Sequence, residues 1–323
     1  MKELKEVNFD NDIILNDNLV KGAILPKTVS ELDRNVIIQG NTIIEGAVYA
    51  HKLEILQGEV DIRGAVYTKL ELHVDSAAKG AVTFRKAVAS SDSVASLTNG
   101  VRMYFLSDIN AKSIKLNNAF IAGSLFADEA VLENCVILGG AFATKKLFLK
   151  NCIVGTFNAP SVAIQGDVHL LLPSAFSVEE LRTVGEARMF NLSLADLGSI
   201  YTGNEQLPES GVIEMDIEKE ELKSVLTADD NQVLMRTYSV VGKVLAADLI
   251  DTDKLNNHFL LTATSLGNQL LQTYSLHDEK NNTLIDIVPE KVADVFFDII
   301  SGKTTVQPLN GNFSIDEIVS KFS

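Results

Sequence analysis

The chain repeats one short phrase, Gly46-Ala-Val-Tyr-Ala50, which returns as Gly64-Ala-Val-Tyr-Thr68 and Gly80-Ala-Val-Thr-Phe84. A second group follows at Gly123-Ser-Leu-Phe-Ala127, Gly140-Ala-Phe-Ala-Thr144 and Gly155-Thr-Phe-Asn-Ala159. The copies lie 18 and 16 residues apart in the first group, and 17 and 15 in the second. A period near 17 predicts a β-solenoid, in which each repeat forms one coil and stacking buries a common core.

Short strand-like runs fill the repeats. From about residue 36, apolar β-branched residues recur in runs of three to five, such as Val36-Ile-Ile38, Thr42-Ile-Ile44 and Val60-Asp-Ile62. Nothing between these runs is long enough for a crossover helix, which argues against a doubly wound α/β fold. Dividing 15 to 18 residues among three faces leaves about five or six per face. The spacing therefore predicts a triangular cross-section.

The glycine of the phrase is expected at a sharp corner, where a positive φ favours glycine. The apolar residue two places later is expected to face the core in every copy: Val48, Val66, Val82, Leu125, Phe142 and Phe157. Residues 90–122 carry only a degenerate repeat, Gly100-Val-Arg-Met-Tyr104. We expect irregular coils or a bulge with a loop in that stretch.

The periodicity changes after Pro173, and helix signals follow. Ser177-Val-Glu-Glu180 has the pattern of a capping box, which opens a helix. An αα-hairpin is predicted by helix signals at Thr227-Ala-Asp-Asp230 and at Thr252-Asp253, the second followed by Phe259, Ala263, Leu266, Leu270 and Tyr274 on one face. A short strand is predicted at Leu284-Ile-Asp-Ile287. Two later helices are predicted, one that begins at Pro289 and ends before Gly302 and one that begins at Ser314-Ile-Asp-Glu317. The chain thus divides into an N-terminal cap over 1–35, a β-helix over 36–172 and a mainly helical domain over 173–323.

Charge and hydropathy limit the partners and the location. The net charge is −15, of which residues 1–170 contribute −2 and residues 171–323 contribute −13. An acidic surface argues against nucleic acid or anionic lipid as the main partner. No window approaches the roughly 18 consecutive apolar residues that span a bilayer, and the first ten residues lack the apolar core of a secretory signal. We expect a cytoplasmic protein without a transmembrane segment.

The titratable residues form no recognisable catalytic or metal-binding motif. The five histidines share no metal-ligand spacing and stand at His51, His73, His169, His258 and His277. The acidic cluster Asp248, Asp251 and Asp253 lacks the glycine and the terminal glutamate of a calcium loop, and a helix-capping turn explains it better. The basic pairs Arg85-Lys86 and Lys145-Lys146 are interpreted as solvated corners. We expect no catalytic residue, no cofactor and no metal ion.

The two cysteines lie one repeat apart in near-identical contexts, Glu133-Asn-Cys-Val136 and Lys150-Asn-Cys-Ile153. A redox pair or a metal site is one interpretation. The favoured one is a ladder, because equivalent positions on stacked coils lie about 4.8 Å apart. Asn134 then stacks on Asn151, and Cys135 stacks on Cys152 as a small buried hydrophobic residue.

One region of the chain has a sequence pattern typical of a known family. It comprises Asn41–Ala50, Leu53-Glu-Ile55, Val60–Thr68 and Leu72-His-Val74, and the repeats of 123–166 continue it less closely. Over residues 36–170 the chain resembles the bactofilins, which are bacterial polymer-forming cytoskeletal scaffolds. The resemblance implies a right-handed three-faced β-helix that polymerises by stacking solenoid ends, independently of nucleotide and without catalytic residues.

The chain also departs from the bactofilin pattern, because a long C-terminal domain follows the solenoid and residues 90–122 interrupt it. We expect a non-enzymatic scaffold that self-associates through its β-helix, with the acidic helical domain recruiting an unidentified protein partner. An alternative is a left-handed β-helix acyltransferase, which needs a strict six-residue repeat and usually a catalytic histidine in a loop. A monomeric adaptor that uses the solenoid as a spacer is a further alternative.

Overall fold

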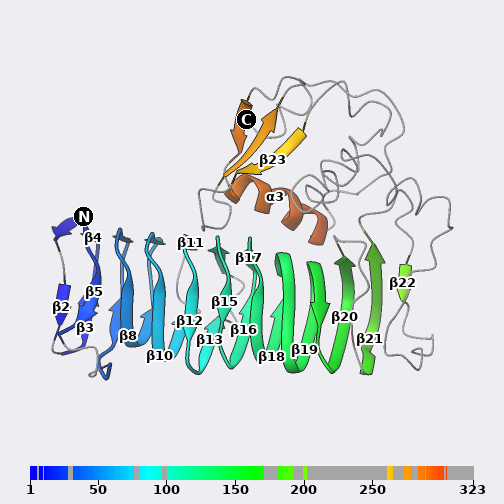
Figure 1. The fold of residues 1–323 in the computed structure, drawn as a ribbon, viewed down its shortest axis with the longest axis horizontal. Helices are drawn as coiled ribbons and strands as arrows, with labels where there is room; N and C mark the ends of the chain where they lie inside the picture. Colours follow the sequence, from blue (N-terminus) through cyan, green and yellow to red (C-terminus); the bar gives the residue numbers. More distant parts are fainter. Residues whose placement is uncertain are drawn as a thin grey trace.

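The computed structural model of the chain describes residues 1–5, 7–9, 11–27, 32–75, 80–96, 100–170, 180–191, 199–201, 260–264, 273–277, 283–287, 289–301 and 303. Most of them form one column of stacked parallel coils, a β-solenoid, with the N-terminus at one end (Figure 1). Helix α3 (Pro289–Ile300) lies along the side of this column. A small antiparallel sheet precedes the helix in the chain.

The strands of the column are β1 (Lys2–Leu4), β2 (Val7–Phe9), β3 (Ile13–Leu15), β4 (Asn18–Val20), β5 (Ile24–Pro26), β6 (Val36–Ile38), β7 (Thr42–Ile44), β8 (Val48–Ile55), β9 (Val60–Ile62), β10 (Val66–Val74), β11 (Gly80–Phe84), β12 (Val88–Ser90), β13 (Ser93–Ser96), β14 (Val101–Phe105), β15 (Ile109–Asn110), β16 (Ser113–Asn117), β17 (Ala119–Ile121), β18 (Leu125–Glu133), β19 (Val136–Asn158), β20 (Ser161–Leu170), β21 (Glu180–Asn191) and β22 (Ser199–Tyr201). The separate sheet comprises β23 (Leu260–Thr264), β24 (Thr273–His277) and β25 (Thr283–Ile287).

The parallel pairings sort these strands into three faces, as the spacing predicted. Face A runs through β2, β5, the first part of β8 and of β10, β12, β15, the first part of β18 and the middle of β19. Face B runs through β3, β6, the second parts of β8 and β10, β13, β16, β18, β19, β20 and β21. Face C runs through β1, β4, β7, β9, β11, β14, β17 and β19.

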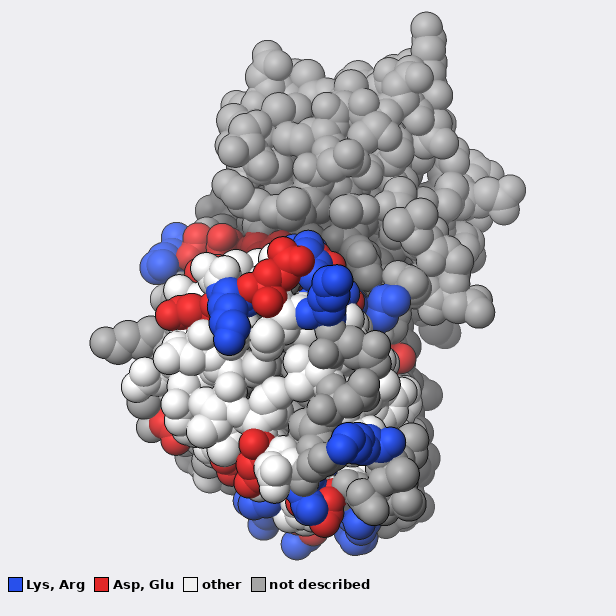
Figure 2. Space-filling view, turned by 90° about the vertical axis from the view of Figure 1, so that its left-hand side faces the viewer, with Lys and Arg blue, Asp and Glu red and all other residues white. Residues whose placement is uncertain are grey.

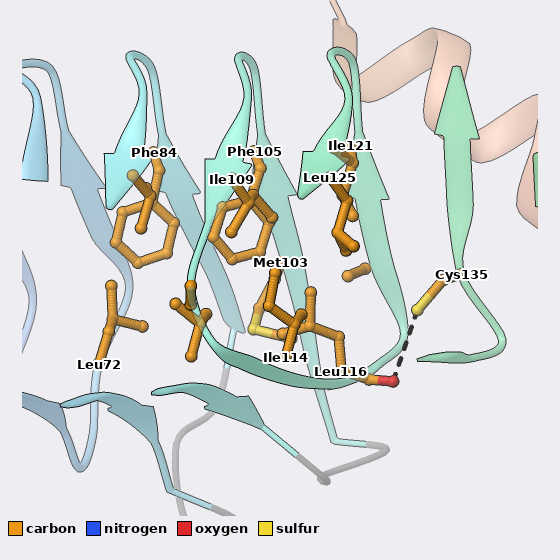
Figure 3. Close-up of a cluster of buried hydrophobic side chains, with 14 of the residues drawn as sticks. Leu72, Phe84, Met103, Phe105, Ile109, Ile114, Leu116, Ile121, Leu125 and Cys135 are labelled. Carbon is orange, nitrogen blue, oxygen red and sulfur yellow. Dashed lines mark hydrogen bonds between the residues drawn. The ribbon is translucent and has the colours of Figure 1, made fainter. Parts of the chain in front are cut away.

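Alternation along each strand sends every second side chain into the column, where the three faces meet. The strands β6, β7 and β9 all have their first and third residues buried and the middle one partly exposed. In the middle of the column Leu72, Met103 and Leu116 pack with the stacked rings of Phe84 and Phe105, whose centroids are 4.8 Å apart (Figure 3). One continuous apolar core therefore holds the coils together.

The glycine of the repeated phrase is required by close contact between coils. A Cβ at Gly64 would lie 2.2 Å from the carbonyl carbon of Gly46, and one at Gly155 would lie 2.1 Å from the oxygen of Gly139. The expected positive φ is found at one glycine of the six copies, Gly80, and was wrong at the others, including Gly46, Gly64 and Gly155. Left-handed conformations occur instead at asparagines of another corner: Asn118, Asn134 and Asn151.

Two copies of the phrase have a different register from the predicted one. Val82 is buried, but it pairs with Val60 on face C, while Val88 takes the place of Val66 on face A. In the second group Gly139, not Gly140, occupies the corner, because Ala141 pairs with Leu125. Phe142 consequently stacks on the exposed Phe126 and does not face the core. The phrase itself is too short to fix which face it occupies.

The described residues of the 90–122 stretch, 90–96 and 100–122, form regular coils, in contrast to the expected irregular segment. Within them β13, β14, β16 and β17 continue faces B and C with unbroken parallel pairing. On face A, Val88 lies 22 residues after Val66 and Ile109 lies 21 after Val88, whereas Leu125 lies only 16 after Ile109. More residues separate β10 from β11 and β13 from β14, so the phrase spacing changes while the strand pairing does not.

The mainly helical C-terminal domain is not supported by the described residues. The helix expected from Ser177 is wrong over Glu180–Asn191, where β21 pairs in parallel with β20 and extends faces B and C. Two further stretches that were assigned to a helix are the strands β23 and β24. In β24, Tyr274 and Leu276 alternate with polar residues, and both strands gain cross-strand partners, which outweighs the helical spacing.

Other expectations for this half of the chain have different outcomes. The strand at 284–287 and the helix that begins at Pro289 are confirmed as β25 and α3. The helices expected from Thr227 and from Ser314 lie outside the described residues. The handedness of the coil and the division of the chain at 35/36 and 172/173 stay predictions.

Candidate functional site

The four histidines that the structure describes lie on four different strands. Nδ1 of His51 lies 3.1 Å from the carbonyl oxygen of Leu32. His73 is on face B, between its register partners Glu54 and Ala95. His169 is on β20, His277 is on β24 and His258 lies outside the described residues. Over the part of the chain that the structure describes, no three His, Cys, Asp or Glu residues are grouped as metal ligands would be.

Cys135 and Cys152 are buried free thiols at equivalent positions of neighbouring coils, which confirms the ladder. The amide of Ile153 donates to the carbonyl oxygen of Cys135, and Asn134 and Asn151 both have left-handed φ angles, 50° and 49°. The Cys135 thiol lies 3.6 Å from the carbonyl oxygen of Leu116 (Figure 3). Burial, together with the neighbouring Cys152 thiol, raises the pKa of Cys135 well above its usual value.

Both thiols are expected to resist a thiol reagent in the native protein. Burial keeps the reagent away from both sulfur atoms, and the raised pKa of Cys135 also leaves that thiol almost no thiolate, which is the reactive form. We expect labelling by Ellman's reagent at pH 8 to be about 100-fold or more slower than in urea-unfolded protein. Rapid native labelling of either cysteine would contradict the ladder, and a Cys152→Ser variant assigns any signal to one thiol.

The basic pairs engage carboxylates of adjacent coils. Nε of Arg85 lies 2.7 Å from Asp61, and Nζ of Lys145 lies 3.1 Å from Asp128. The Arg85 contact belongs to a chain of ion pairs along the outer side of face C; its members are Lys21, Glu45, Arg63, Asp61 and Arg85. These positions are partly exposed, in agreement with solvated corners. The Asp248, Asp251 and Asp253 cluster lies outside the described residues.

A hollow of about 590 Å³ lies at the corner between faces A and B. Aromatic rings stand at its two ends, Tyr67 and the 41% exposed Phe126, with small residues between them. Its lining comprises Tyr67, Ala89, Ser90, Ser91, Asn110, Ala111, Lys112, Phe126, Ala127, Asp128 and Thr144. The Thr144 hydroxyl and the Lys145 ammonium hold the pKa of Asp128 below its usual value. The lining therefore offers apolar contact beside a stable negative charge.

The outer side of face C changes character along the column. Over its first coils it carries the ion pairs described above, but from Tyr104 to Ile153 it carries a run of apolar, buried outward residues. We define the outer strip as Tyr104, Leu106, Phe120, Ala122, Val136, Leu138 and Ile153. These residues alternate with core residues such as Met103 and Ile121 and do not belong to the inner column. Helix α3 packs here with its buried Ala293, Phe296 and Phe297.

Charged and aromatic contacts orient α3 on the outer strip. The guanidinium of Arg102 stacks 4.3 Å from the ring centre of Phe297 and forms an ion pair with Asp294. Tyr104 and Phe120, on adjacent coils, have ring centroids 6.4 Å apart. Burial raises the pKa of Tyr104 above its usual value, against the opposing effect of Arg102. This covered surface had no motif that sequence reasoning could match; its signal was the run of apolar outward residues after Arg102.

The two ends of the column differ. At the N-terminal end β1, β2 and β3 pair with the second coil only, and within the described residues no strand pairs with their outer edges. Their inward side chains Leu4, Val7 and Ile13 are only partly buried. The described surface at the centre of this end carries no charge, and charged residues gather toward its margins (Figure 2). At the other end β22 pairs antiparallel with β21.

Fold and surfaces define the class of the chain, a parallel β-solenoid with three faces. No protein-family model, no curated protein and no solved structure matches the chain. A parallel β-solenoid is compatible with the bactofilin family, but none of these comparisons names that family. The helix that the structure describes is too short to cross a bilayer.

Proposed function

We propose that the chain is a non-enzymatic structural scaffold of the bactofilin-like type, which self-associates through the N-terminal end of its solenoid. The observation that carries this proposal is the first coil, whose strands have an unpaired outer edge within the described residues. Unpaired strand edges are templates for pairing with another chain. Stacking a second copy would also bury Leu4, Val7 and Ile13, which the first coil leaves half-buried.

The distribution of charge supports association by the solenoid over association by the C-terminal half. Residues 1–170 are nearly neutral, so copies can approach without strong repulsion, whereas residues 171–323 carry −13. In this proposal the acidic half stays outside the stack, where it recruits a protein partner. The location would be the cytoplasm, as the sequence suggested.

Placing a charge on the open end is expected to prevent assembly. Ile13 points inward in β3, and its neighbour Ile14 points outward with 59% exposure. We expect Ile13→Lys to weaken self-association by about 100-fold or more, because the ammonium must be desolvated against a second apolar end. Ile14→Lys, the matched control, should assemble like the unaltered chain.

Sedimentation velocity over about 1 to 100 μM protein, a range wide enough to detect a 100-fold loss of affinity, measures self-association. Electron microscopy of the same samples shows the form of the assemblies. Monodisperse monomers of the unaltered chain throughout that range would exclude the scaffold and favour a monomeric adaptor. The melting temperatures of both variants should match that of the unaltered chain, which would show that the substitutions leave the rest of the column folded.

A further inference from the structure

The outward side of face A carries a row of residues in direct register from coil to coil. Along the column the row reads Tyr49, Tyr67, Ala89, Asn110, Phe126 and Phe142. It thus consists of two aromatic residues, two short residues and two more aromatic residues. Because each step along the row is about 4.8 Å, the two short residues leave a gap of about 14 Å between Tyr67 and Phe126. The hollow described above lies in this gap.

The aromatic rings at both ends of the gap are held in place by their neighbours. Phe126 stacks on Phe142, with 18° between the ring planes, so its other face is turned away from Phe142, on the side of the gap. At the opposite end the Tyr67 ring lies 6.1 Å from that of Tyr49, and its hydroxyl is hydrogen-bonded to that of Ser91 at 2.8 Å. Preorganised rings need little further ordering when a ligand packs on them.

Hydrogen-bond donors and acceptors line the hollow between the rings. The exposed amide of Asn110 offers both, and the exposed ammonium of Lys112 offers donors. Asp128 lies on the coil next to Lys112, since its backbone amide donates to the Lys112 carbonyl oxygen at 2.9 Å. Its carboxylate, whose pKa is lowered by Thr144 and Lys145, is an acceptor. The hollow therefore combines flat apolar surface with closely spaced polar groups.

Charge and backbone pairing exclude several classes of ligand from the hollow. Its lining holds one ammonium, Lys112, and one carboxylate, Asp128, so its charges balance. A single-stranded nucleic acid needs a positively charged groove. A peptide that adds as a strand needs an unpaired strand edge, but β10, β12, β15 and β18 are each paired on both sides along face A. The surface favours an uncharged ligand.

We propose that the hollow binds a neutral oligosaccharide. The C–H face of a pyranose ring packs on an aromatic face such as that of Phe126. Each sugar hydroxyl both donates and accepts, which suits the mixture of groups on Asn110, Lys112 and Asp128. The volume of about 590 Å³ is within the range of about 300–1,000 Å³ that is usual for small-molecule sites. The site uses no residue of the first coil, so it does not depend on the self-association proposed above.

Isothermal titration calorimetry of the full-length chain tests the proposal. The probes are maltohexaose, cellohexaose and the hexamer of N-acetylglucosamine, which are neutral sugars with different linkages and substituents. We expect at least one of them to bind with a Kd below about 1 mM. Phe126→Ala should weaken that binding about tenfold or more, because the stacking face is removed. Phe142→Ala, the matched control, removes a ring that does not line the hollow and should weaken binding less than about threefold.

A second variant fills the gap instead of removing a ring. Asn110 is exposed, so Asn110→Phe adds an aromatic ring beside Phe126 and leaves the core unchanged. It should also weaken binding about tenfold or more, with the melting temperature of the unaltered chain.

Three outcomes would overturn the proposal: no binding of any of the three sugars up to about 10 mM, unchanged affinity in both Phe126→Ala and Asn110→Phe, or tighter binding of a single-stranded oligothymidylate. Ile13→Lys should bind the sugars as the unaltered chain does, which separates this site from self-association.

Discussion

Replacing Gly64 by alanine is expected to destabilise the solenoid by about 3 kcal/mol, measured as a shift of the urea midpoint followed by circular dichroism. The added Cβ would lie 2.2 Å from both the carbonyl carbon and the carbonyl oxygen of Gly46. Backbone cannot rotate away as a side chain can. Relief would require the coils to separate, which strains bonds such as that from the amide of Val48 to the oxygen of Ala65, now 2.9 Å.

Gly80→Ala is the matched control for this prediction. Its φ is +97°, but the nearest atom to an added Cβ is the Cβ of Glu59 at 3.6 Å, an ordinary contact. Only backbone strain opposes this alanine, at about 1–2 kcal/mol. If Gly80→Ala proved as damaging as Gly64→Ala, the close approach of coils would not account for the loss.

Truncating Phe105 to alanine is expected to cost about 3–5 kcal/mol, because a large fully buried ring is removed and leaves a cavity. Phe105 is 1% exposed and stacks on Phe84 inside the column. The core there is one residue layer per coil, so neighbouring coils cannot close the gap without losing their register. Urea denaturation measures the loss, with hydrogen exchange to locate it along the column.

Phe126→Ala provides the comparison outside the core. Phe126 also stacks on a phenylalanine of the next coil, Phe142, with ring centroids 5.4 Å apart, but it is 41% exposed. Its truncation should cost less than about 1 kcal/mol. Equal losses for Phe105→Ala and Phe126→Ala would show that the stacked pairs, and not the inner column, dominate the stability.

Much of the solenoid could be predicted because its determinants are local and periodic. The short runs at Val36–Ile38, Thr42–Ile44 and Val60–Ile62 alternate in the way that a half-buried strand requires, and all three are strands. The cysteine ladder followed from two near-identical contexts one repeat apart. Such patterns need only the side-chain period and the coil length.

The register of the coils could not be predicted as well from the sequence. Gly80-Ala-Val-Thr-Phe84 looks like the two phrases before it, yet it pairs with β9 and β14 and lies on face C. Strand preference also outweighed the helical signals between 180 and 191, where the amides and carbonyls find partners on β20. A short phrase is compatible with several faces, and stacking selects one of them.

The amino-acid sequence by itself determined the three-faced column, its apolar lining and the start of α3 at Pro289, since each depends on neighbours within one or two repeats. Only the tertiary structure decided why the repeated residue is glycine and where α3 lies. The first depends on the backbone of Gly46 approaching Gly64 across the stack. The second depends on Arg102 meeting Asp294 from 192 residues away, a contact that no local pattern specifies.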